Sequence, residues 1–395
     1  MRLRGTMRII GACAVSSTLV LTGCSSSSEN EATPSSSKSA SGALEITDVA
    51  GRTVTLDHAP ERVILGESRS IFATSILDKD NPLDKVVGIG TDLQSSVGDY
   101  WERFKPLQPK VTEIPEIGSI KKGDVTVENL VAQKPDVVII SGDQYKAAQS
   151  GDLTDSMDAA GIKYVVTDFR AKPLENTTVS MEVFGKVFGK EAKAKEFNDT
   201  WTKTVNDIQK RTANASTKPK TFVWRAAGLK DCCSTWNDSN ISELVNAAGG
   251  ENVGDMFVQG ESGDLTPEQV IEAQPDQIIV TGGQWGNKKG KDGKTPMFAA
   301  MGYGVDAAAS EASLGELVTH QPGFELLNAP KDGNLHAIWH QFYNSPLNYI
   351  AMAQIAQWLH PEEFADLDVE ALWKDAHDKW VPIEPDGSFF ATYTK

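Results

Sequence analysis

The sequence has 395 residues, with 38 basic and 54 acidic side chains and a formal net charge of -16. A chain this acidic is unsuited to nucleic acid, whose phosphates require basic patches on a partner. The length is sufficient for two domains of ordinary size.

The N-terminus has the layout of a secretory signal over residues 1–23. Arg2, Arg4 and Arg8 flank the start of an uncharged apolar run over 9–21, and small residues follow. The run is shorter than the ~20 residues that a membrane-spanning helix needs. The tetrapeptide LTGC, which ends at Cys24, resembles a lipobox. In that resemblance Cys24 is diacylated and becomes the new N-terminus; the alternative is an ordinary signal with a chance cysteine.

A serine-rich segment without large apolar residues follows Cys24. Its composition cannot bury enough surface to fold, so we expect a disordered linker over 24–43 that tethers a folded domain to the membrane. Cys13 leaves with the signal, so only Cys232 and Cys233 remain in the folded part. In an oxidising compartment these neighbours are expected to form a disulfide, and two reduced thiols are the alternative.

Short apolar segments alternate with helical patterns over residues 44–172. A hairpin is predicted over 45–56, around Ala50-Gly51. Strands are then predicted at 62–66, 85–90, 136–140 and 161–166, with helices at 70–77 and 125–132. This alternation is typical of a parallel α/β lobe.

The pattern changes over 173–216 and then resumes. Residues 175–212 have apolar positions at helical spacing and predict one long amphipathic helix, or two helices with a break near Gly189. A second lobe over 217–395 is predicted from strands at 221–224, 277–281 and 335–339 and helices at 241–248, 267–273, 347–359 and 361–380. The expected fold is therefore α/β, with two lobes that each contain a mostly parallel sheet flanked by helices, joined by a long rigid backbone helix.

One unit occurs twice. Residues 125–140 and 265–280 both read as a threonine, an apolar helix, a Pro-Asp pair and an apolar strand. Thr126 and Thr266 are suited to capping the helix starts, and Glu128 and Glu268 lie in the first turns. Placement against the helix dipole is a sufficient explanation of both glutamates.

At this repeat the chain resembles the substrate-binding lipoproteins of ABC importers for iron chelates, haem and cobalamin. The matching pieces are Asp48-x-x-Gly51-Arg52-x-Val54, Pro60-x-Arg62-Val63, Ile117-Gly118, Ala247-Ala248-Gly249-Gly250-x-Asn252 and Asp332-Gly333-Asn334-Leu335. The resemblance runs from about Ile46 to the end of the C-terminal helical segment. It implies two α/β lobes joined by a backbone helix, and docking of Glu128 and Glu268 with arginines of the permease.

Ligands of such two-lobed proteins bind between the lobes, where loops follow the strand ends. The arginines there are suited to carboxylate or catecholate oxygens and the aromatic residues to a flat chelate. For each residue alone, a surface ion pair or core packing is the alternative. The candidate ligand-binding residues are Arg69, Tyr145, Arg170, Trp224, Arg225, Trp285, His340 and Tyr343.

His340 and Tyr343 have a second interpretation, because both side chains can ligate haem iron. A histidine at a strand end more often only forms a hydrogen bond. A bare metal site would need several His and carboxylate ligands from both lobes, and the first lobe has only His58. We therefore expect no direct metal ligand unless the ligand is haem.

The expected function is capture of a metal chelate, a ferric siderophore in the first place, and its delivery to an ABC permease. Haem or cobalamin binding is the alternative within the class, and a surface-anchored enzyme or sensor is a further one. The sequence has none of the common hydrolase, metalloprotease or nucleotide-binding motifs, so we expect no enzyme and no cofactor. We expect a monomer on the extracytoplasmic face of the cell membrane, anchored by its lipid.

Overall fold

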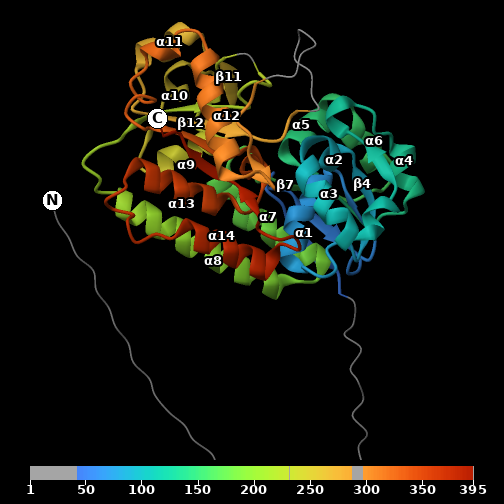
Figure 1. Cartoon of the computed structure of the whole chain (residues 1–395). Coiled ribbons are helices and arrows are strands. Elements are labelled where there is room, and N and C mark those ends of the chain that lie inside the picture. Colours follow the sequence, from blue (N-terminus) through green and yellow to red (C-terminus); the bar gives the residue numbers. More distant parts are fainter. Residues whose placement is uncertain (1–41, 231, 287–296, 395) are drawn as a thin grey trace, which may run out of the picture. The chain divides into compact units, whose positions relative to one another are not determined.

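A computed structural model describes residues 42–230, 232–286 and 297–394 (Figure 1). The signal, Cys24 and the serine-rich linker lie outside these residues, so lipidation stays a prediction. Residues Ser41–Lys395 form one compact unit. In the part of the chain that the structure describes, no helix is both long and apolar enough to cross a membrane.

The first half of this unit, the N-terminal lobe, is built on a five-stranded parallel sheet in the order β5-β4-β3-β6-β7. Its strands are β3 (Val63–Leu65), β4 (Val86–Gly90), β5 (Glu116–Gly118), β6 (Val137–Ser141) and β7 (Tyr164–Thr167). Helices cover both faces, which explains why β3, β6 and β7 are buried along their whole length. The predicted hairpin is present as β1 (Leu44–Thr47) and β2 (Thr53–Leu56), which pair antiparallel.

The helices of this lobe are short. They are α1 (Ile71–Leu77), α2 (Asp92–Ser96), α3 (Gly98–Leu107), α4 (Val127–Ala132), α5 (Gly142–Ser150) and α6 (Leu153–Ala159), with 3-10 turns η1 (Ser68–Ser70), η2 (Pro109–Thr112) and η3 (Ile120–Lys122). Of these, α5 begins immediately after β6 without a loop, because Ser141 and Gln144 form a capping box at its start.

Two helices, and not one, join the halves: α7 (Pro173–Phe188) and α8 (Glu191–Thr212). Gly189 between them has a φ of 67°, a left-handed conformation that ends α7 and lets the chain turn back. α7 and α8 then pack against each other, and Gly185 lies so close to Ala194 that a Cβ atom there would clash. α8 contacts both α1 of the N-terminal lobe and α13 of the second half, so this long helix is the rigid connection (Figure 1).

The second half, the C-terminal lobe, contains a five-stranded sheet in the order β10-β8-β12-β14-β16, parallel except for β16. Its strands are β8 (Lys220–Trp224), β10 (Glu251–Asn252), β12 (Gln277–Gly282), β14 (Leu335–Trp339) and β16 (Phe390–Thr392). Two small antiparallel pairs accompany it. They are β9 (Ser234–Trp236) with β11 (Ser262–Asp264), and β13 (Gly302–Tyr303) with β15 (Gly387–Ser388).

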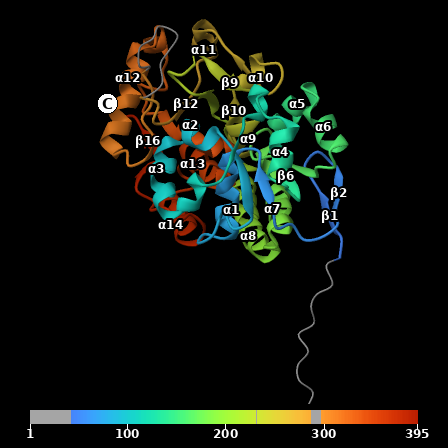
Figure 2. The same ribbon diagram turned by 90° about the vertical axis from the view of Figure 1, so that its right-hand side faces the viewer.

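The helices of the C-terminal lobe surround this sheet (Figure 2). They are α9 (Asn240–Ala247), α10 (Gly254–Phe257), α11 (Pro267–Ala273), α12 (Ala307–His320), α13 (Asn348–Leu359) and α14 (Val369–Trp380), with 3-10 turns η4 (Phe324–Leu326) and η5 (His340–Asn344). The two-lobed α/β architecture predicted from the sequence is therefore confirmed.

The repeated unit folds the same way in both lobes. Thr126 and Thr266 each accept a hydrogen bond from a backbone N–H of the helix that they precede. At the other end of the unit, the Asp136 carboxylate accepts the backbone N–H of Arg62 at 2.9 Å, and Asp276 accepts that of Lys220 at 2.8 Å. Each aspartate thus fixes the start of the neighbouring strand, which explains why the Pro-Asp pair occurs twice.

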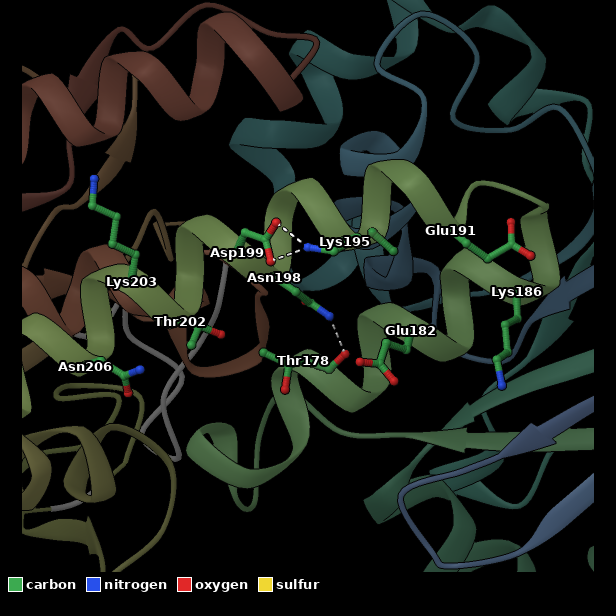
Figure 3. Close-up of a pocket in the computed structure, with 11 residues that line it drawn as sticks. Thr178, Glu182, Lys186, Glu191, Lys195, Asn198, Asp199, Thr202, Lys203 and Asn206 are labelled. Carbon is green, nitrogen blue, oxygen red and sulfur yellow. Dashed lines mark hydrogen bonds and ion pairs between the residues drawn. The ribbon is translucent and has the colours of Figure 1, made fainter.

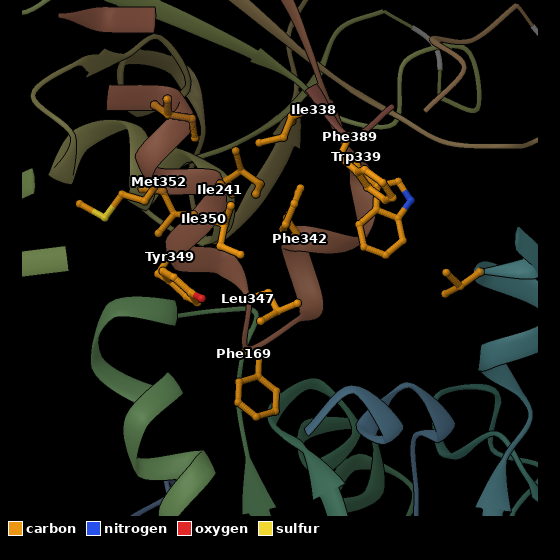
Figure 4. Packing of buried hydrophobic residues seen from close by; sticks show 14 of the residues in the cluster. Phe169, Ile241, Ile338, Trp339, Phe342, Leu347, Tyr349, Ile350, Met352 and Phe389 are labelled. Atoms are coloured by element: carbon orange, nitrogen blue, oxygen red, sulfur yellow. The ribbon is translucent and has the colours of Figure 1, made fainter. Parts of the chain in front are cut away.

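One hydrophobic cluster extends through both lobes. In the C-terminal lobe Trp339 and Phe342 pack edge to face, with ring centroids 5.6 Å apart. Leu347 continues the cluster toward Phe169, which belongs to the N-terminal lobe (Figure 4). The residues that follow the strand ends of the two lobes are therefore held against each other by buried apolar contacts.

Candidate functional site

The predicted arginines all lie directly after strands whose carboxyl ends face the other lobe. Arg69 is in η1 after β3, Arg170 follows β7, and Arg225 follows β8. His340 and Tyr343 are in η5 after β14. The 3-10 turns η1 and η5 place Arg69, His340 and Tyr343 between the lobes. There, hydrogen bonds join residues that are far apart in sequence.

Arg69 is 7% exposed, and its guanidinium group is fully engaged. Its Nε donates to Asp92 at 2.7 Å and its Nη2 donates to Glu67 at 2.5 Å, both within the N-terminal lobe. Nη1 crosses to the C-terminal lobe, where it donates to the Tyr343 hydroxyl and, at 3.4 Å, to Gln341. Arg69 is therefore a cross-lobe contact whose charge is balanced by its own lobe.

Arg170 lies beside Arg69 and shares one of its partners. Its Nη2 donates to Glu67 at 2.9 Å and lies 3.4 Å from the Tyr343 hydroxyl, while Nη1 donates to Asp143. Its Nε is buried and has no hydrogen-bond partner among the described residues. The Asp168 carboxylate accepts the backbone N–H of Arg170 at 2.9 Å and so fixes the position of this arginine after β7.

These contacts shift the ionisation of the acids and phenols around the arginines. Burial raises the pKa of Asp143, but the positive charges of Arg170 and Lys121 lower it by more and hold it well below its usual value. Burial also raises the pKa of Tyr343, but Arg170 and Arg69 lower it by more, and the pKa lies below that of an ordinary tyrosine. A buried phenol between two guanidinium groups is thus easier to ionise than a free one.

Arg225 differs from the other two arginines. Its guanidinium carbon lies 5.1 Å from the ring centroid of Trp236, a cation–π contact. Burial lowers its pKa, Tyr343 acts in the opposite direction, and the positive charge of Arg170 lowers the pKa further. Within residues 42–230, 232–286 and 297–394 no carboxylate lies within ion-pair distance of it, and Asp264 acts only at longer range.

Aromatic rings surround the C-terminal side of this site. The His340 ring stacks on Tyr343 with a centroid distance of 4.5 Å, and Trp285 meets His340 edge to face at 5.5 Å. His340 Nδ1 lies 2.9 Å from the Thr281 hydroxyl. The Trp236 ring is stacked with the His340 ring at a centroid distance of 6.4 Å. In the described part of the chain, no group of three or more His, Cys, Asp or Glu side chains is placed to hold a metal ion.

Six of the eight predicted ligand-binding residues come together here: Arg69, Arg170, Arg225, Trp285, His340 and Tyr343. Trp224 does not, because its side chain is 1% exposed and packs on Phe324 inside the C-terminal lobe. Tyr145 does not either. It lies within α5, where we expected a loop, and its ring packs near Tyr164 and Arg52.

Four further residues belong to the site although they are not among the eight candidate ligand-binding residues: Glu67, Asp92, Asp143 and Trp236. The positions of the three acidic residues could have been predicted from the sequence, since each closely follows an apolar strand. Their pairing with arginines is not visible in the sequence. Trp236 follows Cys232 and Cys233, which the structure joins as a disulfide in the segment between β8 and β9.

Glu128 and Glu268 lie in the first turns of α4 and α11. Both side chains are exposed, and neither forms an ion pair or hydrogen bond with another described residue. Their equivalent placement agrees with the repeat but does not test docking.

A groove of about 760 Å³ runs along the outer side of α7 and α8 (Figure 3). Charged and polar side chains line it, among them Lys195, which pairs with Asp199 at 2.6 Å, and Asn198, which donates to the Thr178 carbonyl at 2.9 Å. No residue that follows a strand end contributes to this groove. Its lining therefore lacks the convergent arginines and aromatic rings of the site between the lobes.

Comparison with known proteins gives matches over most of the chain. The family model of the periplasmic binding proteins matches residues 79–301. The crystal structure of the TroA-like periplasmic binding protein FepB from Veillonella parvula has 29% sequence identity and a TM-score of 0.80, over 89% of this chain and 100% of that chain. None of the curated proteins matches the chain in sequence.

More distant structures share the fold. The molybdate-binding protein MolA from Haemophilus influenzae has 17% identity and a TM-score of 0.63, over 85% of this chain and 97% of that chain. The periplasmic heme-binding protein RhuT from Roseiflexus sp. RS-1 has 17% identity and a TM-score of 0.52, over 77% of this chain and 99% of that chain. The ligands in their names differ chemically although the architecture is shared, so the fold alone does not identify a ligand.

Proposed function

Because the chain belongs to the periplasmic binding protein family, we propose that it captures an anionic metal chelate, a ferric siderophore in the first place, and delivers it to an ABC permease. The family is a class of solute-binding proteins and not of enzymes, and it places the chain on the extracytoplasmic side of the membrane.

The proposal rests mainly on the environment of Arg225. It is a half-buried cation beside a second cation, Arg170, and lacks a carboxylate partner among the described residues. An anionic ligand between the lobes would relieve this repulsion and accept charge-assisted hydrogen bonds from Arg225. The unpartnered Nε of Arg170 is a further donor beside it.

The aromatic rings support a flat or aromatic ligand. Trp236, Trp285 and His340 form a wall on the C-terminal side of the arginines. Catecholate groups combine a ring that stacks on such a wall with oxygens that guanidinium groups bind. A ferric catecholate chelate therefore fits both halves of the site, and its iron brings its own ligands.

Haem is the second candidate, favoured by one contact. Tyr343 has a lowered pKa and stacks on His340, and a phenolate and an imidazole are both iron ligands. The same pair also fits the first proposal, in which Tyr343 only binds Arg69 and Arg170. A Soret band on haem addition, lost in Tyr343→Ala or His340→Ala, would favour haem.

Titration of the purified protein with ferric siderophores, haem and cobalamin tests the proposal. Tryptophan fluorescence should report binding, because Trp236 and Trp285 lie beside the arginines. We expect saturable quenching by a ferric catecholate chelate. Failure of all three ligand classes to bind would refute the metal-chelate proposal, and quenching by haem alone would replace the siderophore with haem.

We also propose that Cys24 carries a lipid and holds the monomeric protein near its permease, which raises the local concentration of the binding protein. Metabolic labelling with a radioactive fatty acid should label the wild-type chain and not Cys24→Ala. Release of the variant from the membrane fraction would agree with this anchor, and equal labelling of both chains would exclude it.

A further inference from the structure

The helices α4 and α11 occupy equivalent places in the two lobes and lie at their outer edges (Figure 1). Each presents an exposed glutamate in its first turn, Glu128 and Glu268. Equivalent exposed acids without a partner in the described structure are suited to contact a basic surface of another protein.

An exposed aliphatic side chain accompanies each of these glutamates. Val131 is one turn after Glu128 on the same face of α4, and it is 48% exposed. At the equivalent place of α11, Ile271 is covered by the segment before η4, since its Cδ1 lies against Gly323. Next to this segment, η4 exposes Leu326, which is 57% exposed and whose carbonyl accepts a hydrogen bond at 3.5 Å from Gln274, at the C-terminal end of α11.

Single exposed apolar side chains are common and carry little information alone. Only five large hydrophobic side chains are strongly exposed in the described residues, and two of them are these. Val131 is on α4 itself, whereas Leu326 is on η4, which packs against α11. Each lobe therefore exposes an aliphatic side chain on, or next to, the helix that carries its glutamate.

The surface charge around the two combinations is unequal. On α11, Glu272 is one turn from Glu268, and both are exposed. Glu325 is exposed beside Leu326. Like charges at this helical spacing repel each other, and a basic partner would remove the repulsion. α4 itself has no second acid, and its flanking charged residues are Asp124 before it and Lys134 after it.

We propose that Val131 and Leu326 are apolar contacts with the ABC permease, each seated beside a basic group that binds Glu128 or Glu268. This inference rests on the proposed function, since it takes delivery to a permease as given. The C-terminal contact, with its additional acids, supplies the more salt-dependent part of the association. The permease surface accordingly has an apolar depression beside each of two basic sites, with more positive charge at the site that meets α11.

The test uses Val131→Ser and Leu326→Ser in the full chain, with Leu107→Ser as the matched control. Leu107 is 53% exposed at the end of α3 and is in neither combination. We expect uptake of radioactive iron supplied as a ferric catecholate to require roughly tenfold more Val131→Ser or Leu326→Ser protein, a typical cost of losing a buried aliphatic contact. Fluorescence titration should show unchanged ligand affinity, and Leu107→Ser should match the wild type in both assays.

Glu128→Lys and Glu268→Lys test docking of the two glutamates with the permease independently of the apolar contacts. If both charge reversals leave uptake intact, docking through the two helices fails, whatever the serine variants do. If the charge reversals abolish uptake but the serine variants behave as Leu107→Ser, the apolar contacts are refuted and docking stands. A photo-crosslinking residue at 131 or 326 should capture the membrane-spanning permease subunit in cells, and one at 107 should not.

The salt dependence of permease binding tests whether the α11 surface contributes more charge to the association than the α4 surface. Glu272→Gln should reduce the loss of permease binding on raising salt, because it removes one charge of the α11 surface. Asn129→Asp should increase that loss, because it adds an exposed acid to α4. Equal salt dependence in the wild type and both variants would show that the surface charges beside the glutamates do not contribute.

Discussion

The hydroxyl of Tyr343, in the C-terminal lobe, accepts a hydrogen bond from Nη1 of Arg69 in the N-terminal lobe. Arg170 approaches the same hydroxyl at 3.4 Å. The two arginines are neutralised within their own lobe by Glu67, Asp92 and Asp143, so Tyr343 joins a pair of cations that are already balanced. The binding capacity for an added anion therefore lies mainly in Arg225.

Replacing Arg225 should weaken ligand binding without destabilising the protein. Arg225→Gln removes about 1.5–3 kcal/mol of charge-assisted hydrogen bonding, which corresponds to a roughly tenfold to hundredfold lower affinity. The melting temperature should change little, since the variant loses no ion pair and its loss of the cation–π contact with Trp236 is offset by the loss of repulsion from Arg170. Fluorescence titration and thermal unfolding measure both effects.

Arg211→Gln is the control for this variant. Arg211 is on α8, where it pairs with Asp207 and Asp366 at the surface, outside the site. Its replacement should leave the ligand affinity unchanged. An Arg225→Gln protein with the affinity of the wild type would exclude Arg225 from ligand binding.

Tyr343→Phe should remove a tyrosine that ionises more readily than an ordinary tyrosine. The guanidinium groups of Arg170 and Arg69 outweigh the effect of burial and lower the pKa of Tyr343. In an alkaline titration followed by phenolate absorbance, the wild type should lose one proton earlier than Tyr343→Phe does. Tyr145→Phe is the comparison, because Tyr145 lies in α5 outside the site. Identical early titration in the wild type and Tyr343→Phe would contradict the contact.

The sequence predicts the fold because the strands of both sheets are covered on two faces. Strands such as β6 and β12 are buried at every position and so contain continuous apolar runs, VVII in β6 and IIV in β12. The repeated Thr, Glu and Pro-Asp positions further indicate that the lobes share a unit. Gly189 indicates the break between α7 and α8, although the packing of these helices against each other depends on contacts that a linear pattern does not contain.

The candidate site is only partly predictable from the sequence, because a strand end defines a position along the sheet but not the contacts made there. A strand end indicates where a side chain lies along the sheet, and this places Arg69, Arg170, Arg225 and Tyr343 well. It does not indicate on which face of the sheet a side chain lies. Trp224 therefore resembles a ligand-binding residue in the sequence, although in the structure it packs on Phe324. Nor does a strand end show that β6 continues directly into α5, which carries Tyr145 away from the arginines.

Cys232 and Cys233 should resist alkylation until the protein is reduced. A form of the protein that begins after Cys24 contains no other cysteines, and the structure joins these two as a disulfide. Intact mass should increase by two hydrogen atoms on reduction, and two alkyl groups should then add. Cys233→Ser should leave one thiol that alkylates without reductant. Alkylation of the untreated wild type at both cysteines would show that the disulfide is absent.

Glu243 should make the stability depend on pH in the direction opposite to an ordinary paired acid. Its carboxylate, on α9, accepts the backbone N–H of Leu174 at 3.1 Å and lies 3.4 Å from Lys172, so it ties the start of α7 to the C-terminal lobe. Burial raises its pKa from 4.5 to about 7, in spite of these two partners. The folded protein therefore holds this proton more tightly than the unfolded chain does.

Stability should consequently fall as the pH rises from the unfolded pKa of 4.5 to the folded pKa of about 7, and this loss should be absent from Glu243→Gln. Chemical denaturation of both proteins at several pH values across this window measures the difference. His336 and His377, whose pKa values burial lowers to about 3 and about 4, act in the other direction but are present in both proteins and cancel. A stability difference between the two proteins that does not change with pH would mean that Glu243 titrates alike in the folded and unfolded chains.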